Sequence, residues 1–410
     1  MKNLTALKQP LLVSAWFMFL TFPLMVIRVN TIENVVEWRW RNMIWVGTAS
    51  FLLTFLWRYL SDRREAARKE AERTEDHEQT LGRFLAGRPE VGRYLSVGAM
   101  ILALIFPFVF STYQTNIMAT ALMYAVLGLG LNIVVGQAGL LNLGYVAFYA
   151  AGAYSYALLN HHFGIGFWTA LPVGAVVGAL FGILLGFPVL RLRGDYLAIV
   201  TLGFGEITRL VLENWNDFSF GPSGISNIPR PGFFGIALDI RGATIYLYFL
   251  VLLLCLATVF IVNRLQNSRI GRAWIAIRED ETASQAMGID GTKTKLTAFA
   301  LGAFWAGMVG VIFAAKTTFI NPASFTFLES AMILSIVVLG GIGSIPGIIT
   351  AALFLILVPE YLRAFSNYRM LIFGSVMVLM MLFRPQGIVA GARRTYTFRR
   401  RKSGPELERG

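Results

Sequence analysis

Uncharged amide side chains interrupt a glycine-rich apolar stretch between residues 127 and 144. Asn132, Gln137 and Asn142 each lie within a few residues of a glycine. An amide both donates and accepts hydrogen bonds without carrying charge, and glycine loosens the backbone around it. Such groups suit a passage that a zwitterionic solute crosses without being held tightly, because a carrier needs weak sites along its route. We expect these three side chains, together with Glu206, to line such a route.

Ionisable residues inside apolar segments form a second group of candidates. They are Glu206, Arg209, Lys316, Glu329, Glu360 and Arg363. An ionised side chain at membrane depth is costly and needs a partner or water. Glu206 and Arg209 stand three residues apart, as do Glu360 and Arg363, so each pair can neutralise itself. A structural ion pair and a role of Glu206 in carrying substrate both remain open at this point.

Motifs that support enzymatic chemistry are absent from the sequence. There is no Gly-Lys pair and hence no phosphate-binding Walker loop, no zincin pair of histidines and no Gly-x-Ser-x-Gly elbow. The histidines, His77, His161 and His162, have no further ligand at metal-binding spacing, and Cys255 is the single cysteine. We therefore predict that the chain is not an enzyme, binds no metal or cofactor and does not hydrolyse ATP itself.

The elements that hold these residues are predicted to lie in a membrane. Of 410 residues, 56% are hydrophobic and only 14% are charged, and the mean hydropathy is +0.61. Long runs without a single charge, such as 171–190 and 246–262, argue against a soluble protein. We predict an all-α integral membrane protein, a polytopic bundle of about 10–12 transmembrane or re-entrant helices.

Twelve apolar segments are candidates for these helices. They cover about 11–27, 43–60, 95–111, 117–136, 139–159, 167–190, 196–212, 244–263, 296–316, 328–343, 346–363 and 369–383. The segment 328–343 ends in a cluster of glycines, which suits a broken or re-entrant helix. Another set of glycines repeats every four residues, a ridge that lets helices approach closely. These are Gly174, Gly178, Gly182 and Gly186.

The placement of Lys and Arg predicts the orientation of the segments. Three parts of the chain are rich in them: 58–93 holds nine, 264–295 holds six, and the chain from residue 384 onward holds eight. By contrast, 160–166 holds none and 213–243 holds two. Because basic connections remain cytoplasmic, we expect the first three, and both termini, inside the cell. These membrane flanks and contact with anionic lipid explain the net charge of +13 better than nucleic acid does.

Four parts of the chain follow from this prediction. They are an N-terminal helix pair (1–60), a charged cytoplasmic loop (61–94), a core of membrane helices (95–390) and a basic cytoplasmic tail (391–410). Charges of both signs alternate in the loop, as they do in solvated segments.

A polar island at 271–290 separates two apolar segments. Asp280 can cap the N-terminus of a short helix, Glu281 lies in its first turn, and Gly288 is placed to end it. The alternative is an ordinary solvated connection, but such connections are usually shorter than this one. The helix would present small apolar residues on one face, which a groove on another protein can accept. These are Ala283, Ala286 and Met287.

Several motifs in order along the chain carry a resemblance to a known family. They are Leu127–Gly144, Leu190–Glu206, Gly221–Ile225, Val338–Ser344 and Arg384–Ile388. In this order and spacing they resemble the M-type (LivM) inner-membrane permeases of branched-chain amino acid ABC importers. The resemblance runs from about residue 95 to 390, and the loop 58–93 is not a constant feature of the family.

The resemblance implies a half-channel in the bacterial inner membrane. Its partners would be a second permease, two cytoplasmic ATP-binding subunits that hydrolyse the ATP, and a periplasmic binding protein that delivers leucine, isoleucine or valine. It also implies that the polar island contacts the ATPase, because Glu281-Thr-Ala283 with Gly288 is similar to the Glu-Ala-Ala…Gly signature of importer permeases. Thr282 and the later glycine depart from that signature. The implied docking residues are Arg278, Glu281, Ala283, Ala286, Met287 and Gly288.

Two other classes remain open from the residues alone. An ion-coupled secondary transporter of small polar solutes would need a coupling site, and a structural membrane scaffold would need neither polar passage residues nor a docking face. Uptake into sealed vesicles separates the classes: an ATP-driven importer requires ATP inside and continues when the ion gradients collapse, a secondary transporter stops when they collapse, and a scaffold gives no uptake.

Overall fold

The computed structural model describes residues 89–190, 192, 194–232 and 239–361, together with 18, 27–30, 35–38, 40–41, 43, 48, 374–375, 378 and 387–388. Several expected elements lie outside the described residues, apart from these single positions. They are the segments 11–27, 43–60 and 369–383, most of the loop 61–94 and the tail 391–410. The chain divides into two compact units, Met1–Gly87 and Arg88–Gly410.

The first unit contains a pair of short antiparallel strands that the sequence analysis did not predict. Strand β1 (Ile27–Asn30) pairs with β2 (Val35–Trp38), and Val29 lies opposite Val36. Three valines and an isoleucine in eight positions explain the pairing, since β-branched side chains pack well on a pleated surface.

The second unit is helical. Its helices are α4 (Pro89–Val109), α5 (Thr112–Asn132), α6 (Val146–Phe163), α7 (Phe167–Val189), α8 (Asp195–Asn214), α9 (Asn216–Ser219), α10 (Ile240–Gln266), α11 (Arg269–Glu279), α12 (Glu281–Ala286), α13 (Gly291–Thr317), α14 (Phe327–Gly340) and α15 (Ile345–Tyr361). A π-helix, η1 (Ile133–Gln137), continues α5, and η2 (Gly221–Ser223) and η3 (Pro322–Ser324) are 3-10 turns.

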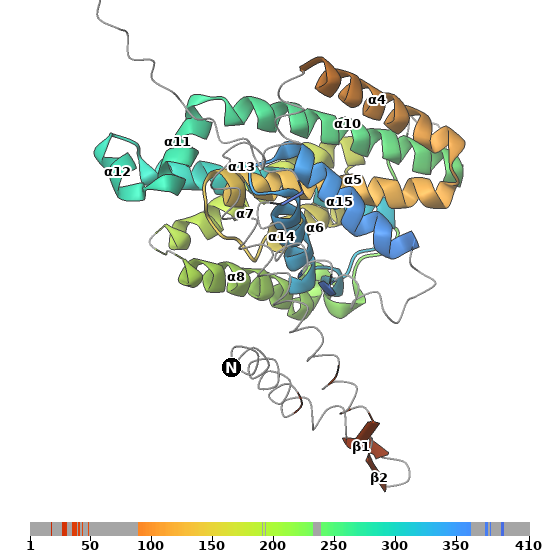
Figure 1. The fold of residues 1–410 in the computed structure, drawn as a ribbon. Coiled ribbons are helices and arrows are strands. Elements are labelled where there is room, and N and C mark those ends of the chain that lie inside the picture. Colours follow the sequence, from red (N-terminus) through yellow and green to blue (C-terminus); the bar gives the residue numbers. More distant parts are fainter. Residues whose placement is uncertain are drawn as a thin grey trace, which may run out of the picture. The chain divides into compact units, whose positions relative to one another are not determined.

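Five of the described helical segments are long and apolar enough to cross a membrane. They are Thr112–Gln137, Phe167–Val189, Ile240–Gln266, Gly291–Thr317 and Pro322–Gly340. The chain is therefore an all-α, polytopic membrane protein in its main unit, as predicted. Helices α4 and α10 run side by side along one edge of this unit, and α11 and α12 project from its left-hand end in Figure 1.

Helix α13 is the centre of the packing, and α7 and α6 lie directly against it. The predicted glycine ridge of α7 is confirmed as the contact surface. A Cβ added at Gly178 would lie 2.6 Å from the carbonyl oxygen of Ala303, and one at Gly182 would lie 2.6 Å from that of Phe299. Only glycine permits backbones to approach this closely, so the ridge sets the distance between the two helices.

The segment between η1 and α6 differs from the prediction. A span was expected to begin at residue 139, but residues 138–145 form an irregular stretch, and α6 begins only at Val146. Gly139 has a φ of +71°, which a helix cannot accommodate. Five of these eight residues are buried and Gly139 is exposed, so protein surrounds most of this non-helical backbone.

The segment 328–343, expected to form a broken or re-entrant helix, forms α14 and the turn after it. Helix α14 has 14 residues, and together with η3 before it makes the apolar stretch Pro322–Gly340, which is long enough to cross a membrane. After Gly340 the chain turns through Gly341 and Gly343, both at positive φ, into α15. Helices α14 and α15 pack together as a hairpin, in which a Cβ at Gly340 would lie 2.6 Å from the backbone nitrogen of Ile348.

Candidate functional site

The three amide side chains predicted to line a passage are buried. The exposed fractions of Asn132 and Asn142 are 0%, and that of Gln137 is 4%. Asn132 is the last residue of α5 and Gln137 the last of η1, whereas Asn142 lies in the irregular segment 138–145. Buried amides are normally hydrogen-bonded, since leaving one without a partner costs about 1–3 kcal/mol.

Only part of the hydrogen-bonding capacity of these amides is used. Asn132 Oδ1 accepts from the backbone N–H of Gly343 at 2.9 Å, and Asn142 Oδ1 accepts from that of Gly144 at 3.0 Å. Within the described part of the chain, neither asparagine Nδ2 group nor either polar atom of Gln137 has a partner. These groups can bind water or a passing solute, which is the property that a passage requires.

The irregular segment that carries Asn142 is held against α8. The backbone N–H of Leu143 donates to Thr201 Oγ1 at 3.0 Å, and Thr201 is fully buried. A Cβ at Gly144 would lie 1.9 Å from the Thr201 carbonyl oxygen, so only glycine fits there. Helix α8 therefore supports the backbone next to the amides from one side.

Arg278, in the last turn of α11 and within the polar island, contacts the region of the amides. Its guanidinium Nη1 donates to the carbonyl oxygen of Gly136 in η1 at 2.5 Å. A Cβ at Gly139 would lie 2.7 Å from Arg278 Cγ, so the missing side chain makes room for the arginine stem. The polar island and the amide region are thus in direct contact.

The short helix predicted in the polar island is confirmed as α12. Asp280 Oδ1 accepts from the Ala283 backbone N–H at 2.9 Å, which is an N-cap, and Gly288 has a φ of +89° after the last turn. Ala283 and Ala286 are exposed, and Met287 is 85% exposed. Within the described part of the chain, this apolar face is exposed, so it can accept a groove on another surface.

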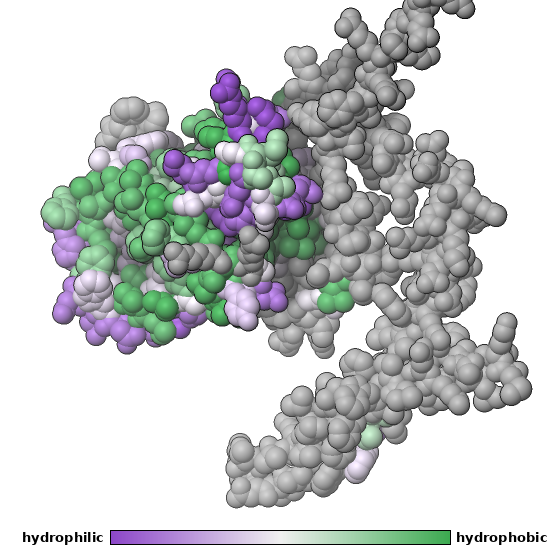
Figure 2. All heavy atoms as spheres, turned by 90° about the vertical axis from the view of Figure 1, so that its left-hand side faces the viewer, coloured by the Kyte–Doolittle hydropathy of each residue, from purple (hydrophilic) through white to green (hydrophobic). Residues whose placement is uncertain are grey.

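The surface around α12, at this end of the bundle, is polar. Figure 2 views the molecule from the α11–α12 end, where hydrophilic side chains gather on a face that is otherwise largely hydrophobic. Asp290 caps α13 by accepting from the Lys293 backbone N–H at 3.1 Å, and this hydrogen bond lowers the pKa of Asp290.

Lys295 is a residue of this region that the sequence analysis did not single out. Its side chain is 4% exposed, and its Nζ lies 2.6 Å from Glu281 Oε1 and 3.3 Å from the carbonyl oxygen of Leu190. Lys295 therefore joins the first turn of α12 to the end of α7. No local pattern connects Glu281 with a lysine fourteen residues later, because the pairing arises from the fold.

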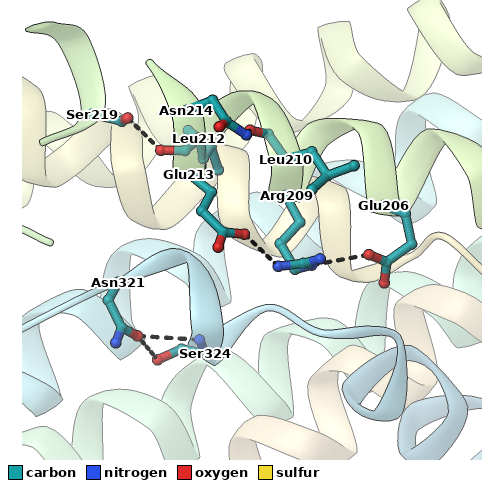
Figure 3. Close-up of polar contacts among 9 residues, drawn as sticks. All are labelled: Glu206, Arg209, Leu210, Leu212, Glu213, Asn214, Ser219, Asn321 and Ser324. Carbon is teal, nitrogen blue, oxygen red and sulfur yellow. Dashed lines mark hydrogen bonds and ion pairs between the residues drawn. The ribbon is translucent and has the colours of Figure 1, made fainter. Parts of the chain in front are cut away.

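Helix α8 carries an ion-pair cluster with one more member than predicted. Arg209 lies between Glu206, at 2.9 Å, and Glu213, at 2.6 Å (Figure 3). The pairing of Glu206 with Arg209 is confirmed, and Glu213 was missed although it stands four residues after Arg209, a spacing that favours such pairs. Among the described residues, Glu206 is hydrogen-bonded to Arg209 and shares no hydrogen bond with the three amides.

Comparison with known proteins supplies the family. The family model described as the permease component of branched-chain amino acid transport systems matches residues 113–381. The chain belongs to this permease family. Two relatives are named high-affinity branched-chain amino acid transport system permease protein LivM. The one from Salmonella typhimurium is 49% identical over 71% of this chain and 73% of its own length, and the one from Escherichia coli is 49% identical over 72% and 74%.

A second kind of relative is more distant. The high-affinity branched-chain amino acid transport system permease protein LivH of Escherichia coli is 24% identical over 65% of this chain and 91% of its own length. No solved structure matches the permease.

The remaining ionisable residues of the permease interior have polar partners. Lys316 Nζ donates to Thr120 Oγ1 at 2.5 Å, Glu329 accepts from the Tyr124 hydroxyl, and Glu360 accepts from the Tyr113 hydroxyl. The expected pair of Glu360 with Arg363 cannot be placed, because Arg363 lies outside the described residues. Among the residues that are described, no three His, Cys, Asp or Glu side chains form a group that could hold a metal ion.

Proposed function

We propose that this permease is the transmembrane subunit of an ATP-driven, binding-protein-dependent importer of branched-chain amino acids. The observation that supports this most is α12, a capped helix with an exposed apolar face at the polar end of the bundle. Such a face is suited to a groove on a cytoplasmic ATPase subunit. The names of the LivM relatives support the substrate class.

The other subunits follow from the same proposal. Two ATP-binding subunits hydrolyse ATP in the cytoplasm, and a periplasmic binding protein delivers the amino acid to the outer side. A second permease completes the passage, and the existence of a LivM and a LivH permease in Escherichia coli supports a pair of related chains. This chain binds no cofactor and acts by changing shape.

The mechanism couples the nucleotide site of the ATPase to the amides of the permease. Closure of the ATPase dimer on ATP moves α12 and the preceding helix α11. Helix α12 is joined to α7 and α13 by the Glu281–Lys295 pair, and α11 is joined to η1 by Arg278. Because the helices around α13 are packed through glycine contacts, they respond as a rigid body, and the passage alternates between inward and outward access.

Uptake of leucine into sealed proteoliposomes tests the proposal. The purified complex is reconstituted with ATP inside and with the binding protein and labelled leucine outside. Uptake should require internal ATP and persist when ionophores collapse the ion gradients. Uptake that needs an ion gradient and ignores ATP would instead establish the alternative, an ion-coupled secondary transporter.

The orientation is proposed from the basic connections: the permease lies in the bacterial inner membrane with both termini in the cytoplasm. We expect cysteines introduced at Asp76 and Ser403 in a Cys255→Ala background to react with impermeant maleimide only from the cytoplasmic side. A cysteine at Asp239, before α10, should react only from outside. Labelling of position 403 in intact spheroplasts would reverse the orientation.

The amides allow a prediction that separates transport from packing. Replacing Gln137 by Met removes polar atoms that have no partner in the described residues, so stability should not fall, while uptake should fall at least tenfold if Gln137 lines the route. Replacing Asn132 by Leu also removes the bond to Gly343, and should lower the free energy of unfolding by about 0.6–2 kcal/mol. Thermal melting and uptake are measured for both. Normal uptake by Gln137→Met would exclude Gln137 from the route.

A further inference from the structure

Among the described residues, helix α8 is packed on one side only. Its buried residues, such as Leu197, Thr201 and Gly205, face α6 and the segment 138–145. The opposite face is exposed in this part of the chain, and its large side chains, together with Gly203, recur at intervals of three and four residues, so they form one stripe. They are Tyr196 (74% exposed), Ile199 (64%), Ile207 (62%) and Leu210 (46%).

Gly203 lies in the middle of this stripe. A Cβ added there would meet no heavy atom of the described residues within 4 Å outside its own helix. The glycines of α7, by contrast, touch the backbone of α13. Gly203 therefore leaves a notch on the outer face of α8 that the described residues do not fill, and such a notch lets another helix approach closely.

The ion-pair cluster borders the same stripe. Glu206, Arg209 and Glu213 have side chains that are 33%, 24% and 39% exposed, and they point to one side of α8 in Figure 3. Two carboxylates surround one guanidinium, so the cluster of these three residues carries a net charge of −1. Glu206 stands near the middle of a helix roughly 30 Å long, in the segment 196–212 that the sequence analysis expects to span the membrane, so we expect this partly exposed charge at membrane depth.

Lipid is a poor occupant for such a face, because charge exposed to hydrocarbon is costly. The exposed side chains of α7 fit lipid far better, since Leu180, Leu184 and Phe187 are apolar. Water alone would cover the charges but would leave Ile199 and Ile207 exposed to it. A protein surface that combines apolar side chains with a hydrogen-bond donor satisfies both parts of the face.

We propose that the outer face of α8, from Tyr196 to Glu213, is the surface against which the second permease subunit packs. The partner would place a helix across Gly203 and a lysine or arginine beside the net-negative cluster. This assignment depends on the proposed function in that it requires a second permease. It goes further in naming the helix, the notch and the charge of the partner.

A matched pair of glycine variants tests the assignment. The permease is expressed with the related permease encoded beside it, the two ATPases and the binding protein, and the complex is purified through a tag on this chain. Gly203→Leu should reduce recovery of the second permease at least tenfold. Gly98→Leu is the control, because Gly98 also lies on an exposed helix with no heavy atom of the described residues within 4 Å of an added Cβ. The control should assemble as the wild type does.

Folding is checked separately by the thermal melting of this chain in detergent, which Gly203→Leu should leave unchanged, since leucine is a better helix former than glycine. Glu213→Gln, which removes the net negative charge that the partner's cation would face, should also weaken recovery of the second permease. A lower melting temperature of the isolated Gly203→Leu chain would place one of this chain's own helices on the face and overturn the proposal. Normal assembly of Gly203→Leu alongside ATP-dependent uptake would overturn the interface and leave the proposed function intact. If Gly203→Leu instead disrupts a dimer of identical chains, the occupant is a second copy and the proposal is wrong. A wild-type chain that recovers no second permease and takes up leucine without ATP would overturn the proposed function itself.

Discussion

Replacing Ala283 by Glu is expected to abolish recovery of the ATPase subunits with the permease, while the permease still inserts in the membrane. Ala283 is exposed on the outer face of α12, close to Met287 one turn later. If an apolar groove of the ATPase covers this face, the new carboxylate is buried without a partner, at a cost of about 3–5 kcal/mol. The affinity should then fall by two to three orders of magnitude.

The matched control is Gln285→Glu, which introduces the same charge on the same helix. The Gln285 side chain faces this chain's own residues, since its Nε2 donates to Glu281 Oε1 at 3.5 Å and would lie 2.9 Å from a Cβ at Gly291. The control should retain the ATPase. Co-purification is measured for both variants, because the new carboxylate beside Glu281 can affect uptake by itself. An unchanged complex with Ala283→Glu would move the docking surface away from α12.

Local signals in the sequence predict the polar island well. Asp280 and Gly288 mark the two ends of α12 because a capping carboxylate and a left-handed glycine act on adjacent backbone groups. The same holds for the glycine ridge of α7 and for the spacing of Glu206 and Arg209, which depend only on helical periodicity.

The irregular segment 138–145 is not predictable in this way. Hydropathy measures whether residues prefer an apolar environment, and most residues of this segment are apolar and buried, like those of the helices beside it. What keeps it irregular is long-range, namely Thr201 accepting from Leu143 and the α8 backbone touching Gly144. The Lys295–Glu281 contact is hidden for the same reason, because its members come together only when α12 folds back on α13.

Arg278 provides the largest expected effect on coupling. It is the direct contact between the polar island and η1, where its guanidinium donates to the Gly136 carbonyl. Carbonyl groups near the end of a helix lack partners in the helix itself, and a charged donor stabilises one of them strongly. Motion of α11 and α12 is thereby transmitted to the backbone that carries Gln137.

Replacing Arg278 by Ala is therefore expected to uncouple ATP hydrolysis from transport. The complex should assemble and hydrolyse ATP at a rate near that of the wild type, while leucine uptake per ATP falls at least tenfold. Arg278→Lys, which retains a cationic donor but not the planar guanidinium, should recover part of the uptake.

Arg272→Ala is the control, because Arg272 lies on the same helix, is exposed, and donates to Asn267 just before α11 rather than to the passage. A general loss of charge or of helix stability would affect both arginine variants alike, whereas a specific connection to η1 affects only Arg278. The ratio of leucine imported to ATP hydrolysed, measured in the same proteoliposomes, distinguishes the two. If Arg278→Ala keeps the wild-type ratio, the force from α12 must reach the amides through the Glu281–Lys295 pair and α13 instead, because that ion pair connects α12 to the bundle independently of Arg278.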